Sequence, residues 1–448
     1  MRTLPRTDTA SRKMTPTVQL MIIFILLNSF GFPGNYTRVF GSRIGMLIEY
    51  ISFFFQLGIM FLLDAKDIME IKLIDLKKKF WPVYMFLAVV FCISMLVTIN
   101  KKEQAISCIR LCTTGLFALW LSENLEIDDF LETAYYAQVL LILANLVFVT
   151  VFRRYVYRES ASYARDFVGV YSAKNGAGTE FAFNLVMHAL LFRIFREKKR
   201  LLPPLFFPVV FLELVLLALT HNVGAMLSAF VAIFYILSLQ KRIELRIPLG
   251  YMYVVGSVGF LLFALTILPF FSPLLESLGK DATLTGRVPL WEQIIKVMQE
   301  NRTLTGFGYG MFWRNDAAVT LIHAGFNRYS FMHGMVSGAH NVTLELWMNI
   351  GLIGIAALYF MILYSYRRIY EIQDNAYLLC TGYMIMFMIY GWTERAFGTY
   401  EYMTLFIFYT TGLANNREIR KERKVLRLRE TPREARFDRI EGSGQRHE

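Results

Sequence analysis

Apolar residues gather in long stretches that recur from residue 18 to residue 414, with polar segments between them. Each stretch is close to the roughly 20 residues that a helix needs to cross a bilayer, or slightly shorter. The pattern therefore predicts an all-α polytopic membrane protein with about twelve transmembrane helices. The windows are 18–33, 44–63, 80–99, 105–121, 131–152, 179–195, 201–219, 223–239, 247–270, 342–363, 376–391 and 399–414. The first window has no small-residue cleavage site and is followed by further spans, so we expect a retained helix and not a signal peptide.

Composition narrows the class of protein further. Of the 448 residues, 55% are hydrophobic and 18% are charged, whereas an ordinary soluble domain has roughly 25% charged residues. This balance excludes a soluble globular enzyme, and the 15% aromatic residues and 29 glycines exclude a disordered, collagen-like or disulfide-stapled chain. The four cysteines lie within apolar stretches, which favours small hydrophobes over a disulfide framework or a thiolate metal site. One membrane domain, residues 18–415, should account for nearly the whole chain.

The distribution of Lys and Arg gives the expected orientation of a chain whose formal net charge is +12. With a cytoplasmic N-terminal segment at residues 1–17, strict alternation places about 30 basic residues inside and about 16 outside, as the positive-inside rule expects. Two loops are exceptions, because 122–130 is acidic but falls inside and 153–174 is basic but falls outside. The basic tail, 416–448, is then a cytoplasmic arm near anionic lipid.

The one long connection, about 271–341, falls on the outer side, and a loop of that length usually has a function and helices of its own. Apolar residues recur in it at helical spacing with polar residues between them, which predicts an amphipathic helix on the membrane surface or over a cavity. These apolar residues are Val288, Trp291, Ile294, Ile295 and Met298. Glycines then alternate from Gly306 to Gly310, which suits either close approach to a ligand or an ordinary flexible turn.

Common catalytic motifs do not occur: there is no Walker-type loop, GxSxG elbow, HExxH or CxxC pair. The long loop also has no clustered carboxylates for a divalent cation, so we expect metal-independent chemistry with no metal and no cofactor. The outer side instead offers Lys174, Arg287 and His340, and cations without carboxylates suit an anionic ligand. Taken singly, each has a structural alternative: membrane anchoring for the two cations, and helix capping for the histidine. Arg395 beside Glu394 is a further candidate, and a structural pair between these two is equally compatible with the sequence.

Four blocks, in this order and spacing, resemble the O-antigen ligase and polymerase superfamily of bacterial membrane glycosyltransferases. The blocks are Gly169 to Gly176, which contains Lys174-Asn175; Leu284 to Trp291, which contains Gly286-Arg287; Gly306 to Trp313; and Ala339 to Glu345, which contains His340-Asn341. The third block is similar to the glycine-rich Phe-Trp turn of exopolysaccharide polymerases. One departure is Thr220-His221-Asn222, where the family often has a Ser-rich or Ser-Arg pattern. No family role is carried to His221, and a polar turn is the preferred interpretation.

The resemblance implies a GT-C-like fold that transfers a glycan from an undecaprenyl diphosphate carrier to an acceptor hydroxyl, on the outer face of the bacterial plasma membrane. His340 is the expected catalytic base of an inverting displacement, because a neutral imidazole can accept the proton of the hydroxyl. Arg287 and Lys174 are expected to stabilise the leaving diphosphate. The other expected substrate-binding residues are Asn175, Asn341 and Tyr309. A protonated His340 that binds the diphosphate is the alternative to the base.

A polymerase that lengthens exopolysaccharide, capsule or O-antigen is the leading interpretation. The nearest alternative is a ligase of the same superfamily, which hands the glycan to lipid A-core or another acceptor. A transporter or flippase is less expected, because no internal symmetry of the spans is visible. The expected partners are the lipid-linked donor, the glycan acceptor, the bilayer, a chain-length regulator and a flippase, but no nucleic acid.

Overall fold

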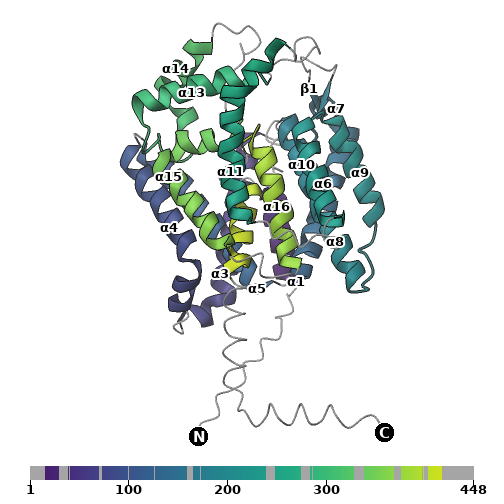
Figure 1. Ribbon diagram of the computed structural model, residues 1–448. Coiled ribbons are helices and arrows are strands. Elements are labelled where there is room, and N and C mark those ends of the chain that lie inside the picture. Colours follow the sequence, from purple (N-terminus) through teal and green to yellow (C-terminus); the bar gives the residue numbers. More distant parts are fainter. Residues whose placement is uncertain are drawn as a thin grey trace, which may run out of the picture.

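The computed structural model shows long helices that lie side by side, with shorter helices across one end of the molecule (Figure 1). The predicted N-terminal segment (except its last two residues), the tail 416–448 and parts of the long outer loop lie outside the described residues. The structure describes residues 16–29, 39, 41–69, 73–98, 100–125, 127–158, 165–171, 173–238, 248–273, 283–284, 286–326, 338–367, 375–395, 397 and 402–415.

Every predicted window overlaps a helix, which confirms the all-α fold. These helices are α1 (Pro16–Ser29), α3 (Ser42–Met69), α4 (Leu73–Val97), α5 (Lys101–Asn124), α6 (Ile127–Val151), α8 (Lys174–Glu197), α9 (Phe206–Leu219), α10 (Val223–Ser238), α11 (Leu249–Leu262), α15 (Val342–Tyr366), α16 (Asn375–Gly391) and a helix at 402–415. Within the described residues, 6 helices are long and apolar enough to cross a membrane, and four shorter ones are also apolar. A multi-pass membrane protein follows, while the number of twelve crossings stays a prediction.

The amphipathic helix predicted in the long loop is confirmed as α13 (Arg287–Asn301). Trp291, Ile294 and Met298 are fully buried on one face, whereas Glu292 and Lys296 are exposed on the other. The buried face packs against α14 (Asp316–Phe326) and α15, so the helix covers protein at this end of the molecule (Figure 1). The remaining elements are α7 (Arg153–Val156), the antiparallel pair β1 (Tyr157–Arg158) and β2 (Asp166–Phe167), the π-helix η2 (Phe263–Ile267), and the 3-10 helices η3 (Leu268–Phe271) and η4 (Phe312–Arg314).

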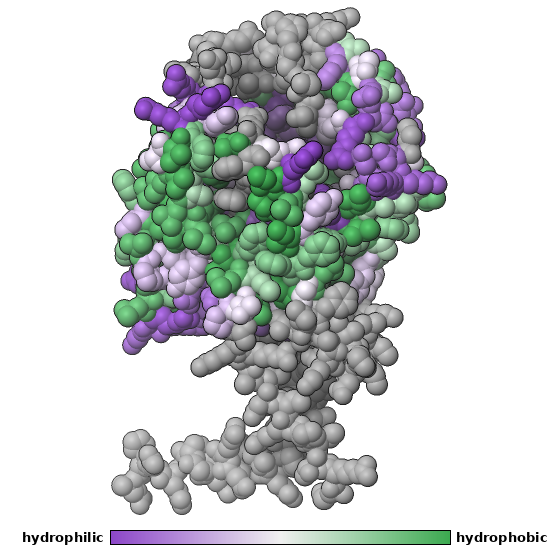
Figure 2. All heavy atoms as spheres, turned by 180° about the vertical axis from the view of Figure 1, so that it is seen from behind, coloured by the Kyte–Doolittle hydropathy of each residue, from purple (hydrophilic) through white to green (hydrophobic). Residues whose placement is uncertain are grey.

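The helix at 402–415 lies at the centre of the helical domain, since every one of its residues is buried. The ring centroid of its Phe406 lies 4.5 Å from that of Phe183, and the ring centroid of its Tyr409 lies 4.3 Å from that of Phe130. Apolar side chains of the outer helices point away from the core, as shown by Phe230 on α10, which is 68% exposed. Figure 2 shows such side chains as an apolar region between polar ends, the distribution that lipid contact favours.

The connections meet at two ends, as the predicted alternation requires. At the end opposite α13, the acidic start of α6 faces the basic connection between α8 and α9. Lys198 binds Asp128, and Arg200 lies 3.0 Å from Glu132. Within the acidic loop 122–130, Asp128 is therefore paired with basic residues, so this loop can share a side with the basic connection as the predicted orientation requires.

Helix α15 is broken at Gly351, whose backbone has φ 65° and ψ −175°. Before the break, the carbonyl of Met348 accepts a hydrogen bond from the amide of Phe307 at 2.8 Å. The carbonyl of Asn349 accepts one from the amide of Gly308 at 2.9 Å. Two amides after the break donate to the carbonyls of Thr303 and Leu304 at 3.1 and 3.2 Å. The segment 303–308 thus replaces hydrogen bonds that the interrupted helix cannot make for itself, as a membrane-embedded backbone requires.

The alternating glycines permit this contact. Gly306, Gly308 and Gly310 all have positive φ, at 65°, 98° and 74°, a region that other residues rarely adopt. A Cβ atom on Gly308 would lie 2.2 Å from Oε1 of Gln104 on α5. The glycines therefore bring the turn close to neighbouring helices of the same chain.

Gly351→Ala should destabilise the protein, because the backbone conformation is one that glycine alone adopts easily and the new Cβ would lie 2.1 Å from the Leu304 carbonyl oxygen. Strain of this kind costs on the order of 1–3 kcal/mol. We expect a lower melting temperature in detergent. Gly259→Ala, at an apolar position with nothing within 4 Å, is the matched control. Equal melting of the two variants would contradict the role of the break.

The predicted orientation can be tested with single cysteines in a background where Cys92, Cys108, Cys112 and Cys380 are all replaced by Ser. Glu300→Cys on α13 should react with a membrane-impermeant maleimide added to intact spheroplasts, whereas Lys199→Cys should react only after permeabilisation. Both positions are exposed at opposite ends of the molecule. The reverse pattern would invert the topology.

Candidate functional site

Two buried carboxylates organise the end of the molecule that carries α13. Glu394 lies shortly after the end of α16, and its side chain is 7% exposed. Asp166 lies on β2, and its side chain is 5% exposed. We call the groups around them the Glu394 centre and the Asp166 centre. Both form among segments that are far apart in the sequence.

The Glu394 centre contains three of the predicted site residues. Nη2 of Arg287 donates to Oε1 of Glu394 at 2.5 Å, and Nδ2 of Asn175 donates to the same oxygen at 2.7 Å. Nδ1 of His340 lies 2.9 Å from the other oxygen, Oε2. Arg287 is the first residue of α13 and Asn175 the second of α8, while His340 lies just before α15. One carboxylate therefore fixes side chains from three helix starts.

The contact with Glu394 determines which nitrogen of His340 can accept a proton. An ionised carboxylate can only accept hydrogen bonds, so Nδ1 must carry the hydrogen and Nε2 is left as the basic atom. The side chain of His340 is 36% exposed, whereas that of Glu394 is buried beneath it. This is the arrangement in which a carboxylate orients a histidine that acts as a general base.

The pKa of Glu394 supports this picture. Burial alone raises the pKa of the carboxyl, but the hydrogen bond and charge of His340, together with those of Arg287, outweigh burial and hold the pKa below its ordinary value of 4.5. Glu394 is therefore ionised at neutral pH.

The Asp166 centre contains Lys174 and a second histidine. Nζ of Lys174 lies 2.8 Å from Oδ2 of Asp166, and Nδ1 of His221 lies 3.0 Å from Oδ1. The two centres are neighbours along the chain, because Lys174 in one precedes Asn175 in the other. The carbonyl of Asn175 also accepts from Nδ2 of Asn222 at 3.3 Å. Residues expected at one site thus fall into two linked centres.

The two histidines occupy equivalent positions. The tripeptide His-Asn-Val occurs at 221–223 and at 340–342. In each case the histidine has positive φ, 52° for His221 and 49° for His340, and the asparagine caps the helix that follows. In each case Nδ1 faces a buried carboxylate. The repeated tripeptide was the sequence signal that could have identified His221, which the motif comparison left as a polar turn.

Asn341 supports the site through the backbone. Its Oδ1 accepts from the amides of Thr343 and Leu344 at 3.0 and 3.1 Å, and its Nδ2 donates to the carbonyl of Trp392 at 3.1 Å. It therefore ties the start of α15 to the segment that carries Glu394. Direct contact with substrate stays a prediction for this residue.

Tyr309 lies in the glycine-rich turn and is only 3% exposed. Its amide donates to Oγ of Ser94 at 3.0 Å, and its carbonyl accepts from Nε2 of Gln104 at 3.0 Å. Its ring packs against that of Phe397, with the two ring centroids 6.3 Å apart. These contacts fix the turn to α4 and α5, and the expected binding role of the hydroxyl is untested.

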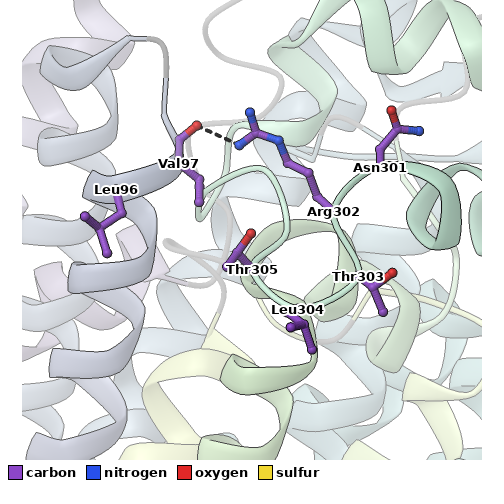
Figure 3. Close-up of a pocket in the computed structure, with 7 residues that line it drawn as sticks. All are labelled: Leu96, Val97, Asn301, Arg302, Thr303, Leu304 and Thr305. Atoms are coloured by element: carbon purple, nitrogen blue, oxygen red, sulfur yellow. Dashed lines mark hydrogen bonds between the residues drawn. The ribbon is translucent and has the colours of Figure 1, made fainter.

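An open pocket of about 560 Å³ lies beside the turn (Figure 3). In it, Nη1 of Arg302 donates to the carbonyl of Val97 at 2.8 Å. None of the predicted site residues line this pocket. The lining residues are Leu96, Val97, Asn301, Arg302, Thr303, Leu304 and Thr305.

The fold and the two centres define a multi-pass helical membrane protein with a charged site at one end. Residues 208–359 match the family model described as O-antigen ligase, which confirms the resemblance to the O-antigen ligase and polymerase superfamily. The matched region contains His221, Arg287 and His340, whereas Lys174 and Glu394 lie outside it. No curated protein matches the chain. The match supports an enzyme of the polysaccharide ligase or polymerase type.

Glu394→Gln should lower the free energy of unfolding by on the order of 3 kcal/mol, because it removes the charge that Arg287 and His340 share. Since the pKa of Glu394 is lower in the folded protein, its contribution to stability is present above pH 4.5 and is lost as the pH falls through the folded-state value. The part of the acid sensitivity that arises from Glu394 should therefore disappear in the variant. Thermal melting in detergent across acidic pH measures both effects.

Glu300→Gln, on the exposed face of α13, is the control for loss of a surface carboxylate. If Glu394→Gln melted like the wild type at neutral pH and kept the same acid sensitivity, the buried carboxylate would not hold the site together.

Proposed function

We propose that this protein is a membrane glycosyltransferase that polymerises undecaprenyl-diphosphate-linked oligosaccharide repeat units into exopolysaccharide, capsule or O-antigen. The reaction takes place on the outer face of the bacterial plasma membrane. The observation that carries the proposal is that Arg287 and His340, both within the segment similar to O-antigen ligases, contact the same buried carboxylate, Glu394. This arrangement holds a cation and a base side by side.

The cations suit a leaving diphosphate. Arg287 uses Nη2 to bind Glu394, and a guanidinium has five N–H donors in all, so others are available for phosphate oxygens. Lys174 likewise has three donors and contacts Asp166 through its Nζ. The buried carboxylates hold both cations in place before substrate arrives. Preorganised donors of this kind stabilise the charge that develops on the leaving group.

His340 supplies the base. The acceptor hydroxyl oxygen attacks the anomeric carbon, the bond from that carbon to the diphosphate oxygen breaks, and the hydroxyl proton passes to Nε2 of His340. Glu394 stabilises the resulting imidazolium through Nδ1. A single displacement inverts the anomeric configuration and needs no metal. In this proposal the partners are the lipid-linked donor, the growing chain as acceptor, a flippase and a chain-length regulator.

A ligase is the second candidate, because the description of the matching family is O-antigen ligase. The chemistry at the two centres would be the same. The acceptor would be lipid A-core or another surface molecule in place of the growing chain.

Glycan length in cells deleted for the gene tests the function. Complementation with His340→Ala or Arg287→Ala should fail to restore long chains at equal membrane levels, because loss of one preorganised donor typically lowers the rate by 10²–10³. Arg314→Ala removes an exposed cation that pairs with Glu103 at the same end of the molecule, and it should complement fully.

The product that accumulates separates the two candidates. Single repeat units in the deleted cells support the polymerase, whereas long chains that stay on the lipid carrier support the ligase. Full complementation by His340→Ala would contradict its role as the base.

A further inference from the structure

A second group of ionisable side chains lies within the helical domain, away from both centres. Glu180, Asn184 and His188 are spaced four residues apart on α8, so they share one face of the helix. Glu213 lies on α9, which packs against α8. All four are buried, with 0% of Glu180, Asn184 and Glu213 exposed and 2% of His188. We call these four residues the α8–α9 carboxyl cluster.

The polar atoms of the cluster are poorly paired. Nδ1 of His188 lies 2.7 Å from Oε2 of Glu213, and Asn184 lies beside both carboxyl groups. Among the described residues, however, neither oxygen of Glu180 and neither oxygen of Glu213 accepts a hydrogen bond of normal geometry. Both atoms of the Asn184 amide are also unpaired. Buried polar atoms are usually satisfied, so this concentration of exceptions indicates a missing occupant.

The charges of the cluster do not balance either. It contains two carboxyl groups and one imidazole, so that even a protonated His188 leaves one net negative charge. In the described part of the chain, no Lys or Arg forms an ion pair with Glu180 or Glu213, and His188 is the one cationic partner of Glu213. An uncompensated charge in a dry interior is strongly unfavourable. A bound positive charge is therefore required.

We propose that the α8–α9 carboxyl cluster is a proton-binding site, in which Glu180 and Glu213 hold one carboxyl proton between them while His188 is the counter-ion. The proton removes the net charge and supplies an O–H donor to an oxygen that otherwise has none. A metal ion fits less well, since the described residues contain no group of three or more His, Cys, Asp or Glu side chains that could hold one. Ionisable groups at membrane depth commonly serve proton binding.

Charged residues on the described neighbouring elements are paired outside the cluster, as Asp166 on β2 is with Lys174 and His221 and Asp128 on α6 is with Lys198. The hydroxyl of Tyr135 on α6 donates to the carbonyl of Pro204, and its ring lies edge-on to His188 at 5.4 Å. Tyr171, which precedes α8, lies near both carboxyl groups as a neutral phenol. On the other side of α8, Tyr235 of α10 donates to Tyr377, and Tyr383 of α16 donates to the carbonyl of Met403. Within the cluster, the two carboxyl groups and His188 are thus one another's nearest ionisable neighbours.

Infrared spectroscopy of the purified full chain in detergent tests the site directly. At neutral pH the wild type should show the carbonyl stretch of a protonated, buried carboxylic acid. Glu180→Gln should lose this band, because the remaining Glu213 is then neutralised by His188. Glu300→Gln, which removes an exposed carboxyl on α13, should keep it.

Glu180→Asp covers the case in which the glutamine variant fails to fold. It keeps a carboxyl at this position, so the band should persist at a shifted frequency. A wild-type spectrum without the band, or a band that neither Glu180 variant alters, would overturn the proposal. Loss of the band on replacing choline by sodium would show that a metal cation competes for the site, and would overturn it as well. None of these outcomes depends on glycosyl transfer, so the proposed function is tested separately.

Discussion

A buried carboxylate, Glu394, is the interaction on which the architecture of the site depends. It binds Asn175, Arg287 and His340, which come from three helix starts separated by long stretches of chain. A carboxylate that is almost completely excluded from water must be compensated by hydrogen-bond donors or positive charges. The three side chains therefore converge on this one carboxylate. Asp166 repeats the principle with Lys174 and His221. Together the two carboxylates explain how cations and histidines can be held ready at a membrane surface.

The broken helix places one part of this site. The half of α15 that follows His340 ends at Gly351, and the segment after α13 is hydrogen-bonded to the break. Arg287 at the start of α13 and His340 before α15 are therefore positioned by two neighbouring helices whose far ends are tied together. The glycines of the turn 306–310 allow this connection, because they admit a backbone that side chains would obstruct. In the sequence, the pattern of these glycines suited close approach to a ligand or a flexible turn. In the fold they help to position Arg287 and His340 without lying in either centre.

Apolar periodicity predicted the helices and the amphipathic α13, because burial and lipid contact act on whole stretches of sequence. The motif comparison also found Arg287, His340 and Asn175, which do meet. The contact of Glu394 with these three residues could not be predicted, because a pairing between distant parts of the chain leaves no local sequence pattern. On sequence grounds, Arg395 was an equally good partner for Glu394. His221 was missed for the same reason, although its repeated tripeptide was visible. The acidic loop 122–130 departs from the positive-inside pattern in the sequence, but in the fold Lys198 and Arg200 lie beside its Asp128.

The helix starts at the site have an electrostatic consequence of their own. Helices α8, α10, α13 and α15 all begin where the two centres lie, at Lys174, Val223, Arg287 and Val342. Each N-terminus carries a partial positive charge of about half a unit from its aligned peptide dipoles, and no side chain caps the first amides of α8 and α13. The cationic side chains are neutralised by Glu394 and Asp166, but the field of the four backbones is not carried by any side chain. The orientation of these four helices therefore attracts an anion independently of the side chains. This attraction would persist in a variant that has lost any single basic residue.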